Sequence, residues 1–133
     1  MKIAIVGATG LVGTNIINLC EQYFDVGVEY SLFASKSSEG KKIKINNKDI
    51  TVKELNKENI GEYNISLFSA GGERSKEYAT NFIDNGSFVI DNSSVFRMND
   101  EVPLVVYGIN ENIISKESKL ISNPNCTTMG LVM

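Results

Sequence analysis

A turn spaced by glycines, close to the N-terminus, constrains the fold of this chain more than any other feature. Residues 2–6 read KIAIV, a short apolar run typical of a buried strand, and residues 7–13 read GATGLVG. Gly7 permits a tight turn, Gly10 lets a ligand approach the backbone, and Gly13 lets the following helix pack closely on the strand. Strand, glycine turn and helix in this order predict a dinucleotide-binding loop, with a pyrophosphate at the positive end of the helix. Glycines that merely turn the chain are the alternative.

The rest of the chain alternates strand-like apolar runs with amphipathic helical segments. The expected strands are 2–6, 29–34, 65–68, 88–90, 102–106 and 119–121, and the expected helices are 10–22, 75–85 and 127–133. The first helix is expected to pack on the sheet through apolar residues that recur at helical spacing, namely Leu11, Val12, Ile16, Leu19, Cys20 and Tyr23. Residues 42–52 alternate around Asn46-Asn47, which predicts a hairpin outside the parallel pattern. The alternation predicts an α/β fold with a Rossmann-type, doubly wound, mainly parallel sheet and flanking helices.

Length, composition and charge limit the number of domains and the kinds of partner. The chain has 133 residues, of which 42% are apolar and 22% charged, and its net charge is −3. These values are typical of one soluble globular domain, and they count against nucleic-acid and membrane partners. The first apolar run is too short for a signal peptide, so we expect a cytoplasmic protein in which the two cysteines are free thiols. The chain contains no histidine, the most common proton shuttle near neutral pH.

The loop after the expected strand at 29–34 bears on the choice of dinucleotide. A site that prefers NAD usually has a carboxylate here to hold the ribose 2′-hydroxyl, whereas residues 35–38 read SKSS. Hydroxyls and a cation suit a 2′-phosphate instead, although Glu39 works against it. We therefore expect NADP, with NAD as the alternative ligand and a solvated surface loop as the alternative structure.

A second candidate site surrounds Cys126, in a segment 122–128 that reads SNPNCTT. Pro124 cannot donate to a strand ladder, so it ends the preceding strand and places Cys126 at or beside a helix N-terminus. The helix dipole favours thiolate there, and nearby backbone N–H groups suit an oxyanion. Cys20 lies among apolar residues and is interpreted as an inert core side chain. Cys126 is therefore the candidate nucleophile.

These motifs resemble, in order and spacing, those of the aspartate-semialdehyde dehydrogenase family. The matching segments are GATGLVG at 7–13, SAGG at 69–72, DNSSVFRM at 91–98, VPLVV at 102–106 followed by Asn110, and SNPNCTT at 122–128. The resemblance implies an oxidoreductase that reduces L-aspartyl 4-phosphate to L-aspartate 4-semialdehyde with NADPH, through a cysteine thioester. This reaction belongs to lysine, threonine and methionine biosynthesis.

The resemblance also implies roles for individual residues. Cys126 would be the nucleophile, Asn125 would orient the acyl oxygen, and Arg97 would bind the phosphate group, as a guanidinium can do with two hydrogen bonds. Asn92 and Ser93 would assist at the substrate and phosphate site. The implied cofactor residues are Gly7, Thr9, Gly10, Leu11, Val12, Ser35, Lys36, Ser37, Ser38, Ser69, Ala70 and Gly71. No metal site is expected.

The chain also departs from the family pattern. Where the family usually has an arginine, two residues after the serine that matches Ser35, this chain has Ser37. The family is more than twice as long, so residues 1–133 correspond to its NAD(P)-binding domain. The acid–base histidine and a second, catalytic and dimerisation domain are expected outside it. The chain alone is therefore expected to be inactive, with an undetermined oligomeric state, although full-length family members are homo-oligomers.

Three other interpretations are left open by the sequence. The first is a non-catalytic module that binds NADP, against which the presence of Cys126 and Arg97 counts, since binding alone needs neither. The second is a relative of N-acetyl-glutamyl-phosphate reductase, which favours Pro-Gly-Cys where this chain has Pro124-Asn125-Cys126. The third is glyceraldehyde-phosphate dehydrogenase, whose nucleophile is also followed by Thr-Thr.

Overall fold

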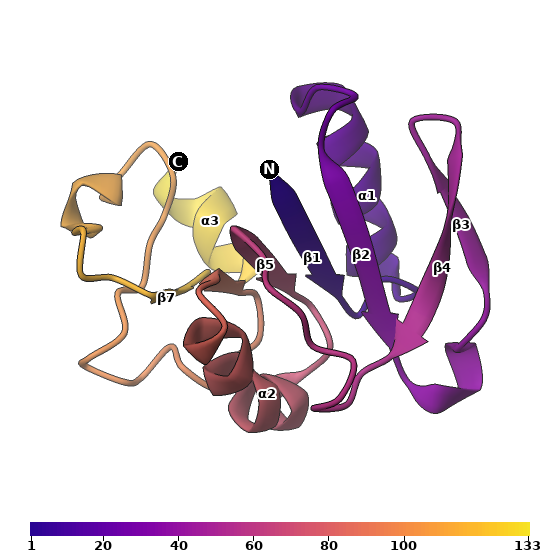
Figure 1. Ribbon diagram of the computed structural model, residues 1–133. Helices are drawn as coiled ribbons and strands as arrows, with labels where there is room; N and C mark the ends of the chain where they lie inside the picture. Colours follow the sequence, from indigo (N-terminus) through magenta and orange to yellow (C-terminus); the bar gives the residue numbers. More distant parts are fainter.

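The computed structural model describes residues 1–133 and contains one sheet of seven strands, in the order β3-β4-β2-β1-β5-β6-β7 (Figure 1). The strands are β1 (Lys2–Val6), β2 (Glu29–Ala34), β3 (Lys42–Ile45), β4 (Lys48–Glu54), β5 (Ile65–Phe68), β6 (Phe88–Asp91) and β7 (Leu120–Ser122). The helices are α1 (Leu11–Tyr23), α2 (Gly72–Asp84) and α3 (Cys126–Val132), with 3₁₀ turns at Lys36–Ser38 and Glu111–Ile113. All neighbouring strands are parallel except β3 and β4, which confirms the predicted Rossmann-type sheet.

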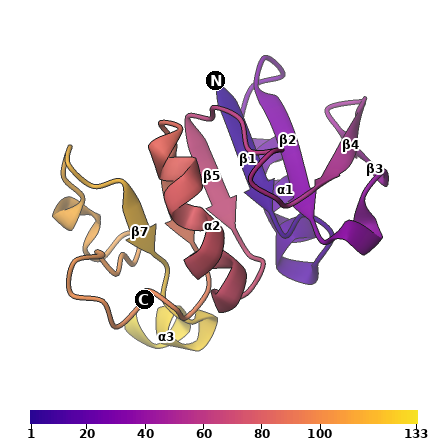
Figure 2. The same cartoon turned by 60° about the horizontal axis from the view of Figure 1, so that its bottom comes forward.

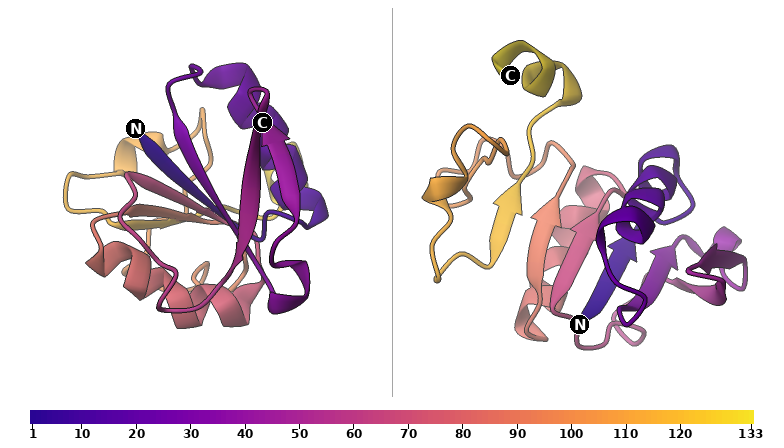
Figure 3. Two further views of the ribbon diagram at one scale, coloured as in Figure 1. Left: turned by 45° about the vertical axis from the view of Figure 1, so that its right-hand side comes forward. Right: turned by 90° about the horizontal axis from the view of Figure 1, so that it is seen from above.

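The two long helices lie on opposite faces of the sheet, and α3 stands beyond the carboxyl end of β7 (Figures 2 and 3). The central strand β1 is buried on both faces, because its side chains alternate between the two cores. Ala4 and Val6 belong to the core under α2, whereas Ile3 and Ile5 belong to the core under α1. The continuous apolar run of β1 is therefore the expected sequence for the middle strand of a doubly wound sheet.

An aromatic cluster fixes α2 on its face of the sheet. The ring of Phe82 is fully buried, and its centroid lies 5.6 Å from that of Phe33 and 5.1 Å from that of Phe68, edge to face in both cases. Tyr63 completes the cluster, 5.9 Å from both Phe33 and Phe82. Each such pair contributes about 1 kcal/mol beyond the area it buries. The cluster joins α2 to β2 and β5, so it also fixes where the N-terminus of α2 points.

The inner face of α1 differs from the prediction. The buried positions are Gly13, Ile17 and Cys20, whereas Leu11 and Tyr23 are 84% and 78% exposed. The close approach of Gly13 to the turn before it sets the rotation of the helix about its axis. Residues four and seven positions later then lie on the same face. The interpretation of Leu11, Val12, Leu19 and Tyr23 as core residues is therefore wrong, because all four are exposed.

The hairpin predicted at 42–52 is present as β3 and β4, but it is part of the main sheet. Asn46 and Asn47 have φ values of 50° and 63°, the left-handed pair that a two-residue hairpin turn requires. The strand β4 also pairs in parallel with β2, with Leu32 opposite Val52, and both side chains enter the core under α1. The expectation that the hairpin lies outside the parallel pattern is wrong, because only β3 is antiparallel.

The prediction of a strand at 102–106 is also wrong. Only one bridge forms there, between Leu104 and Ser122 of β7. Pro103 has no N–H to donate, so the ladder is limited to the bonds from Val105 N to Ser122 O and from Ser122 N to Pro103 O, each 2.9 Å long.

No helix in the structure has the length and apolar character needed to cross a membrane.

Candidate functional site

The predicted site residues gather at one edge of the sheet. The glycine turn follows β1, residues 35–38 follow β2, residues 69–71 follow β5, Asn92 follows β6, and residues 123–126 follow β7. These strands are parallel, so their carboxyl ends meet at the same edge, where doubly wound folds bind their ligands.

The glycine turn is built around two close backbone contacts. Gly7 has a φ of +88°, and its N–H donates to the carbonyl of Phe33 at 2.9 Å, which ties the turn to β2. A Cβ on Gly7 would lie 2.7 Å from the carbonyl carbon of Ser69. A Cβ on Gly13 would lie only 2.0 Å from the carbonyl oxygen of Gly7. Glycine is therefore required at both positions for the chain to fold, before any ligand is considered.

The N-terminus of α1 is open to an anion. Gly10 is the N-cap residue and has no side chain to cap the helix. The backbone N–H groups of Leu11, Val12 and Gly13 donate no hydrogen bond within the protein. A Cβ on Gly10 would meet only the oxygen of Gly7, at 3.5 Å, so its outer side faces open space. Free amides beside an open glycine fit a dinucleotide pyrophosphate.

A cavity of about 230 Å³ lies beside this turn. It is lined by Gly7, Thr9, Gly10, Ala34, Ser35, Leu55, Ser69, Ala70 and Arg74. The structure thus brings six of the predicted cofactor residues, apart from those that supply the α1 amides, to one cavity. Arg74 and Leu55 were not identified from the sequence, because their positions depend on how α2 and β4 pack. Gly71 does not line the cavity, but it is the N-cap of α2 at its rim.

The loop 35–38 is less uniform than its sequence suggests. Ser35 lines the cavity and its hydroxyl is 2.9 Å from that of Ser37, while Lys36 and Ser37 are exposed beside it. Ser38 is buried, and its oxygen accepts a hydrogen bond from the hydroxyl of Thr9 at 3.4 Å. Ser38 therefore joins this loop to the glycine turn, while Ser35 faces the cavity.

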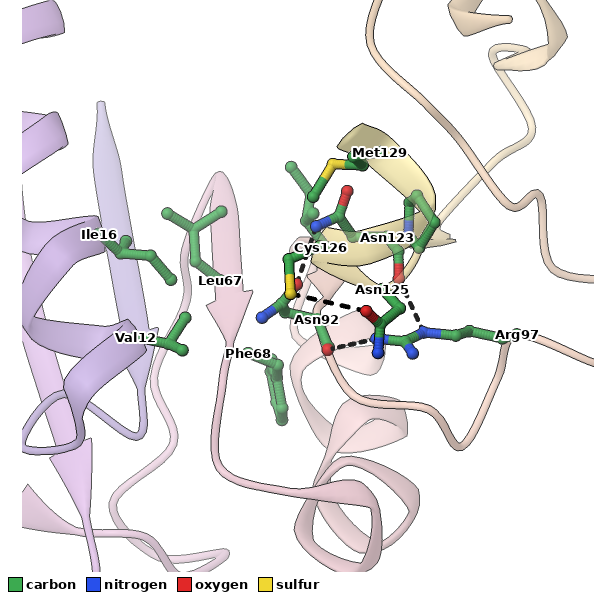
Figure 4. A pocket seen from close by; sticks show the side chains of 12 residues that line it. Val12, Ile16, Leu67, Phe68, Asn92, Arg97, Asn123, Asn125, Cys126 and Met129 are labelled. Atoms are coloured by element: carbon green, nitrogen blue, oxygen red, sulfur yellow. Dashed lines mark hydrogen bonds between the residues drawn. The ribbon is translucent and has the colours of Figure 1, made fainter. Parts of the chain in front are cut away.

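A second, larger cavity of about 580 Å³ lies on the α1 face of the sheet, between α1 and α3 (Figure 4). It is lined by Val12, Ile16, Leu67, Phe68, Ile90, Asn92, Arg97, Asn123, Pro124, Asn125, Cys126 and Met129. Leu67 and Ile90 belong to the sheet, and Val12 belongs to the first turn of α1. The cavity therefore brings Cys126, Asn125 and Arg97 together beside the open N-terminus of α1.

Asn125 holds Cys126 at the start of α3. The side-chain oxygen of Asn125 accepts from the backbone N–H of Thr127 at 2.8 Å and from the thiol of Cys126 at 3.5 Å. The first bond makes Asn125 the N-cap of the helix. Because its oxygen is used in this way, the amide NH₂ of Asn125 is the group left to donate to a ligand.

Arg97 is fixed in the cavity without a neutralising partner (Figure 4). Its Nε donates to the carbonyl of Asn123 at 2.9 Å, and its Nη2 donates to the carbonyl of Asn92 at 3.0 Å. The side chains of Asn123 and Asn92 are in turn bonded at 2.8 Å. Arg97 forms no ion pair, since the single salt bridge in the structure joins Lys44 to Asp49. Its remaining donors and its full charge suit an anion. Asn123 was not identified from the sequence.

Ser93 does not line this cavity. Its hydroxyl donates to Oδ2 of Asp91 at 2.6 Å, and the hydroxyl of Ser75 donates to Oδ1 of Asp91 at 2.5 Å. The Asp91 side chain is fully buried. The carboxylate therefore links α2 to the loop that carries Asn92, and Ser93 contributes to the shape of that loop.

Replacing Asp91 by alanine should lower the free energy of unfolding by about 2 kcal/mol, because the hydroxyls of Ser75 and Ser93 lose their acceptor. Urea unfolding followed by circular dichroism measures the change. Asp100→Ala, at an exposed position, is the control and should leave the midpoint unchanged. An unchanged midpoint for Asp91→Ala would contradict the structural role of this carboxylate.

Comparison with known proteins identifies the family of the chain independently of the geometry of the site. The family model described as "Semialdehyde dehydrogenase, NAD binding domain" matches residues 2–117. The aspartate-semialdehyde dehydrogenase of Aquifex aeolicus is 46% identical over 99% of this chain and 40% of its own length. The chain thus spans about two fifths of the length of the curated relatives it matches.

Solved structures match in fold as well as in sequence. The aspartate semialdehyde dehydrogenase II of Vibrio cholerae, complexed with ASA, superposes with a TM-score of 0.90 at 39% identity, over 98% of this chain and 44% of that one. The aspartate semialdehyde dehydrogenase of Candida albicans, solved with NADP, superposes with a TM-score of 0.79 at 26% identity, with the same coverage of 98% and 44%. With its sheet order, its open glycine turn and the family match over most of its length, the chain belongs to the semialdehyde dehydrogenase family, as its NAD-binding domain.

Proposed function

We propose that this chain is the dinucleotide-binding part of an aspartate-semialdehyde dehydrogenase, which reduces L-aspartyl 4-phosphate to L-aspartate 4-semialdehyde with NADPH and releases phosphate. The observation that carries the proposal is the cavity that holds Cys126, Asn125 and Arg97 beside the N-terminus of α1. A nucleophile, an amide donor and an unpaired guanidinium are the groups that acyl transfer from an acyl phosphate requires. The relatives of the chain carry the name of this enzyme.

The residues of the cavity act in a fixed order in this proposal. The thiolate of Cys126 attacks the acyl carbon of the substrate, the bond from that carbon to the phosphate oxygen breaks, and a thioester remains on Cys126. The free donors of Arg97 hold the leaving phosphate. The amide NH₂ of Asn125 donates to the acyl oxygen while negative charge develops on it. The donors of Arg97 and Asn125 used here have no other partner in the structure, and the thiol of Cys126 has only its 3.5 Å bond to Oδ1 of Asn125.

The second half of the reaction returns Cys126 to its starting state. NADPH, when bound at the glycine turn, supplies the hydride that reduces the thioester carbon. The resulting thiohemiacetal then expels the sulfur of Cys126 and leaves the aldehyde. A proton must be moved in this step, and the chain has no histidine to move it. The acid–base histidine that the family resemblance implies is therefore proposed to lie in a second, catalytic and dimerisation domain, and these 133 residues alone should not turn over substrate.

The same proposal also implies a pathway, a location, an oligomeric state and a set of ligands for the protein. The product is a precursor of lysine, threonine and methionine, so the protein is placed in cytoplasmic amino-acid biosynthesis. The full-length protein is expected to be a homo-oligomer that assembles mainly through the second domain. Its ligands are small molecules, namely the substrate, phosphate and the dinucleotide.

For the cofactor, we expect the chain to bind NADP about 10-fold more tightly than NAD. The cavity at the end of β2 contains the hydroxyl of Ser35 and no carboxylate, and charge-assisted hydrogen bonds to a 2′-phosphate supply this difference. Calorimetric titration of the purified chain with each dinucleotide measures it, after circular dichroism has shown that the chain is folded. A folded chain that binds neither dinucleotide would contradict the proposed function.

A further inference from the structure

Arg74 is a cation in the dinucleotide cavity that the proposed reaction does not use. It lies in the first turn of α2, and it lines the cavity together with Ser35 and the glycine turn. Its guanidinium forms no ion pair and donates no hydrogen bond in the structure. It is the single ionisable residue among those that line the cavity. An arginine in such a position keeps all five donors available to a ligand.

The backbone around Arg74 adds positive potential to the same cavity. The N-cap of α2 is Gly71, which has a φ of +89° and no side chain to cap the helix. The backbone N–H groups of Gly72, Glu73 and Arg74 donate no hydrogen bond within the protein. The α1 N-terminus across the cavity is equally open. A free guanidinium and the uncapped start of α1 therefore line this cavity, and the uncapped start of α2 lies at its rim.

No carboxylate forms an ion pair with Arg74. Glu54 is the last residue of β4 and does not line the cavity, and its Oε2 accepts from the amide of Asn56 at 3.2 Å. On α2, Glu73 precedes Arg74 by one residue and Glu77 follows it by three; both are exposed, and neither lines the cavity. The end of β2 carries Ala34 and Ser35, so no acidic side chain occupies the place from which a carboxylate would hold a ribose 2′-hydroxyl.

We infer that Arg74 binds the 2′-phosphate of NADP, from the α2 side of the cavity opposite Ser35. In this fold the pyrophosphate lies at the N-terminus of α1, and the adenosine ribose lies at the end of β2, where an arginine accommodates a 2′-phosphate. A guanidinium binds a phosphate with two parallel hydrogen bonds. The loop 35–38 supplies hydroxyls and Lys36 but no arginine. Arg74 supplies the missing guanidinium from a different element. This inference rests on the proposed binding of NADP.

The test is a calorimetric titration of the wild-type chain and three variants with NADP and with NAD. Arg74→Gln should weaken NADP binding about 10- to 100-fold and change NAD binding less than about 2-fold, because only the 2′-phosphate loses its partner. Arg74→Lys should keep part of the preference, since an ammonium is a cation without the planar fork. Lys76→Gln is the matched control, because it removes an exposed cation from the same helix outside the cavity, and both affinities should stay unchanged.

Each other outcome identifies what has failed. If Arg74→Gln binds NADP as well as the wild type does, the role of Arg74 is wrong while the proposed function stands. If Arg74→Gln weakens NADP and NAD equally, Arg74 contacts a group common to both dinucleotides, and the assignment to the 2′-phosphate is overturned. If the folded wild-type chain binds neither dinucleotide, the proposed function and the role of Arg74 fall together. Urea midpoints equal to that of the wild type show that each variant is folded.

Discussion

Gly13→Ala should destabilise the chain by at least about 3 kcal/mol, although alanine is the better helix former by about 1 kcal/mol. The new Cβ would lie 2.0 Å from the carbonyl oxygen of Gly7 and 2.9 Å from the Cα of Ala8. Both neighbours are backbone atoms, so no flexible side chain can move aside. Moving the turn would also break the bond from Gly10 N to Gly7 O, which is 3.1 Å long. Urea unfolding measures the loss as a lower midpoint at unchanged slope.

The neighbouring glycine gives the contrast that separates folding from binding. In Gly10→Ala the Cβ would meet only Gly7 O, at 3.5 Å, and the φ of Gly10 is −79°, which any residue adopts. Its stability should stay within about 1 kcal/mol of the wild type. Its affinity for NADP should fall at least about 10-fold, because the methyl group stands where the pyrophosphate meets the backbone. Equal stability losses at Gly10 and Gly13 would contradict the geometry of the turn.

The two cysteines should differ in alkylation rate by about a thousandfold or more. Burial raises the pKa of the Cys20 thiol to about 11, so at pH 8 only about one molecule in a thousand carries the reactive thiolate there. Cys20 is also only 3% exposed, whereas Cys126 is exposed at the start of α3. Native protein treated with iodoacetamide at pH 8 should gain one label, at Cys126, and protein unfolded in urea should gain two. Intact-protein mass spectrometry counts the labels.

The control for this experiment is Cys126→Ser, which should gain no label when native and one when unfolded. Native labelling at Cys20 should become measurable only as the pH rises toward 11. Since the ordinary pKa is 9.0, the folded state favours the protonated thiol, and its contribution to stability is lost as the pH rises from about 9 to about 11. Rapid labelling of Cys20 in the native protein at pH 8 would refute the buried placement of this thiol.

The sequence predicts the elements of this fold better than it predicts their faces. The apolar run of β1 indicates a strand that is buried on both faces, and the periodicity of α2 indicates a single buried face. In α1, however, the apolar residues come in adjacent pairs, such as Ile16 and Ile17, and spacing alone does not show which member faces the sheet. Only Ile17 is buried, because the contact of Gly13 with the glycine turn sets the rotation of the helix.

The sequence likewise identifies some residues of the candidate site and misses others. Cys126 and Asn125 are adjacent in sequence, and one motif identifies both. The sequence around Arg74 gives no sign of a ligand-binding role, because its place in the cavity depends on how α2 packs relative to the distant strand β2. Ser93 has the sequence context of a ligand-binding residue, yet the buried carboxylate of Asp91 takes its hydroxyl. Contacts between distant segments decide both cases, and local pattern does not contain them.

The outer strand β3 affects how the domain behaves at high concentration. An edge strand presents free backbone groups to which another chain can pair, which is the usual start of aggregation through sheets. In β3 the exposed side chains of Lys42 and Lys44 lie on one side of the strand, two residues apart. A second copy aligned along this edge would bring four ammonium groups together, of which only the two from Lys44 have a carboxylate partner, Asp49. The opposite edge is covered, because Val105 and Pro103 bond to Ser122 of β7. Two lysines at one edge and a single crossing segment at the other thus oppose pairing of the sheet with a second copy.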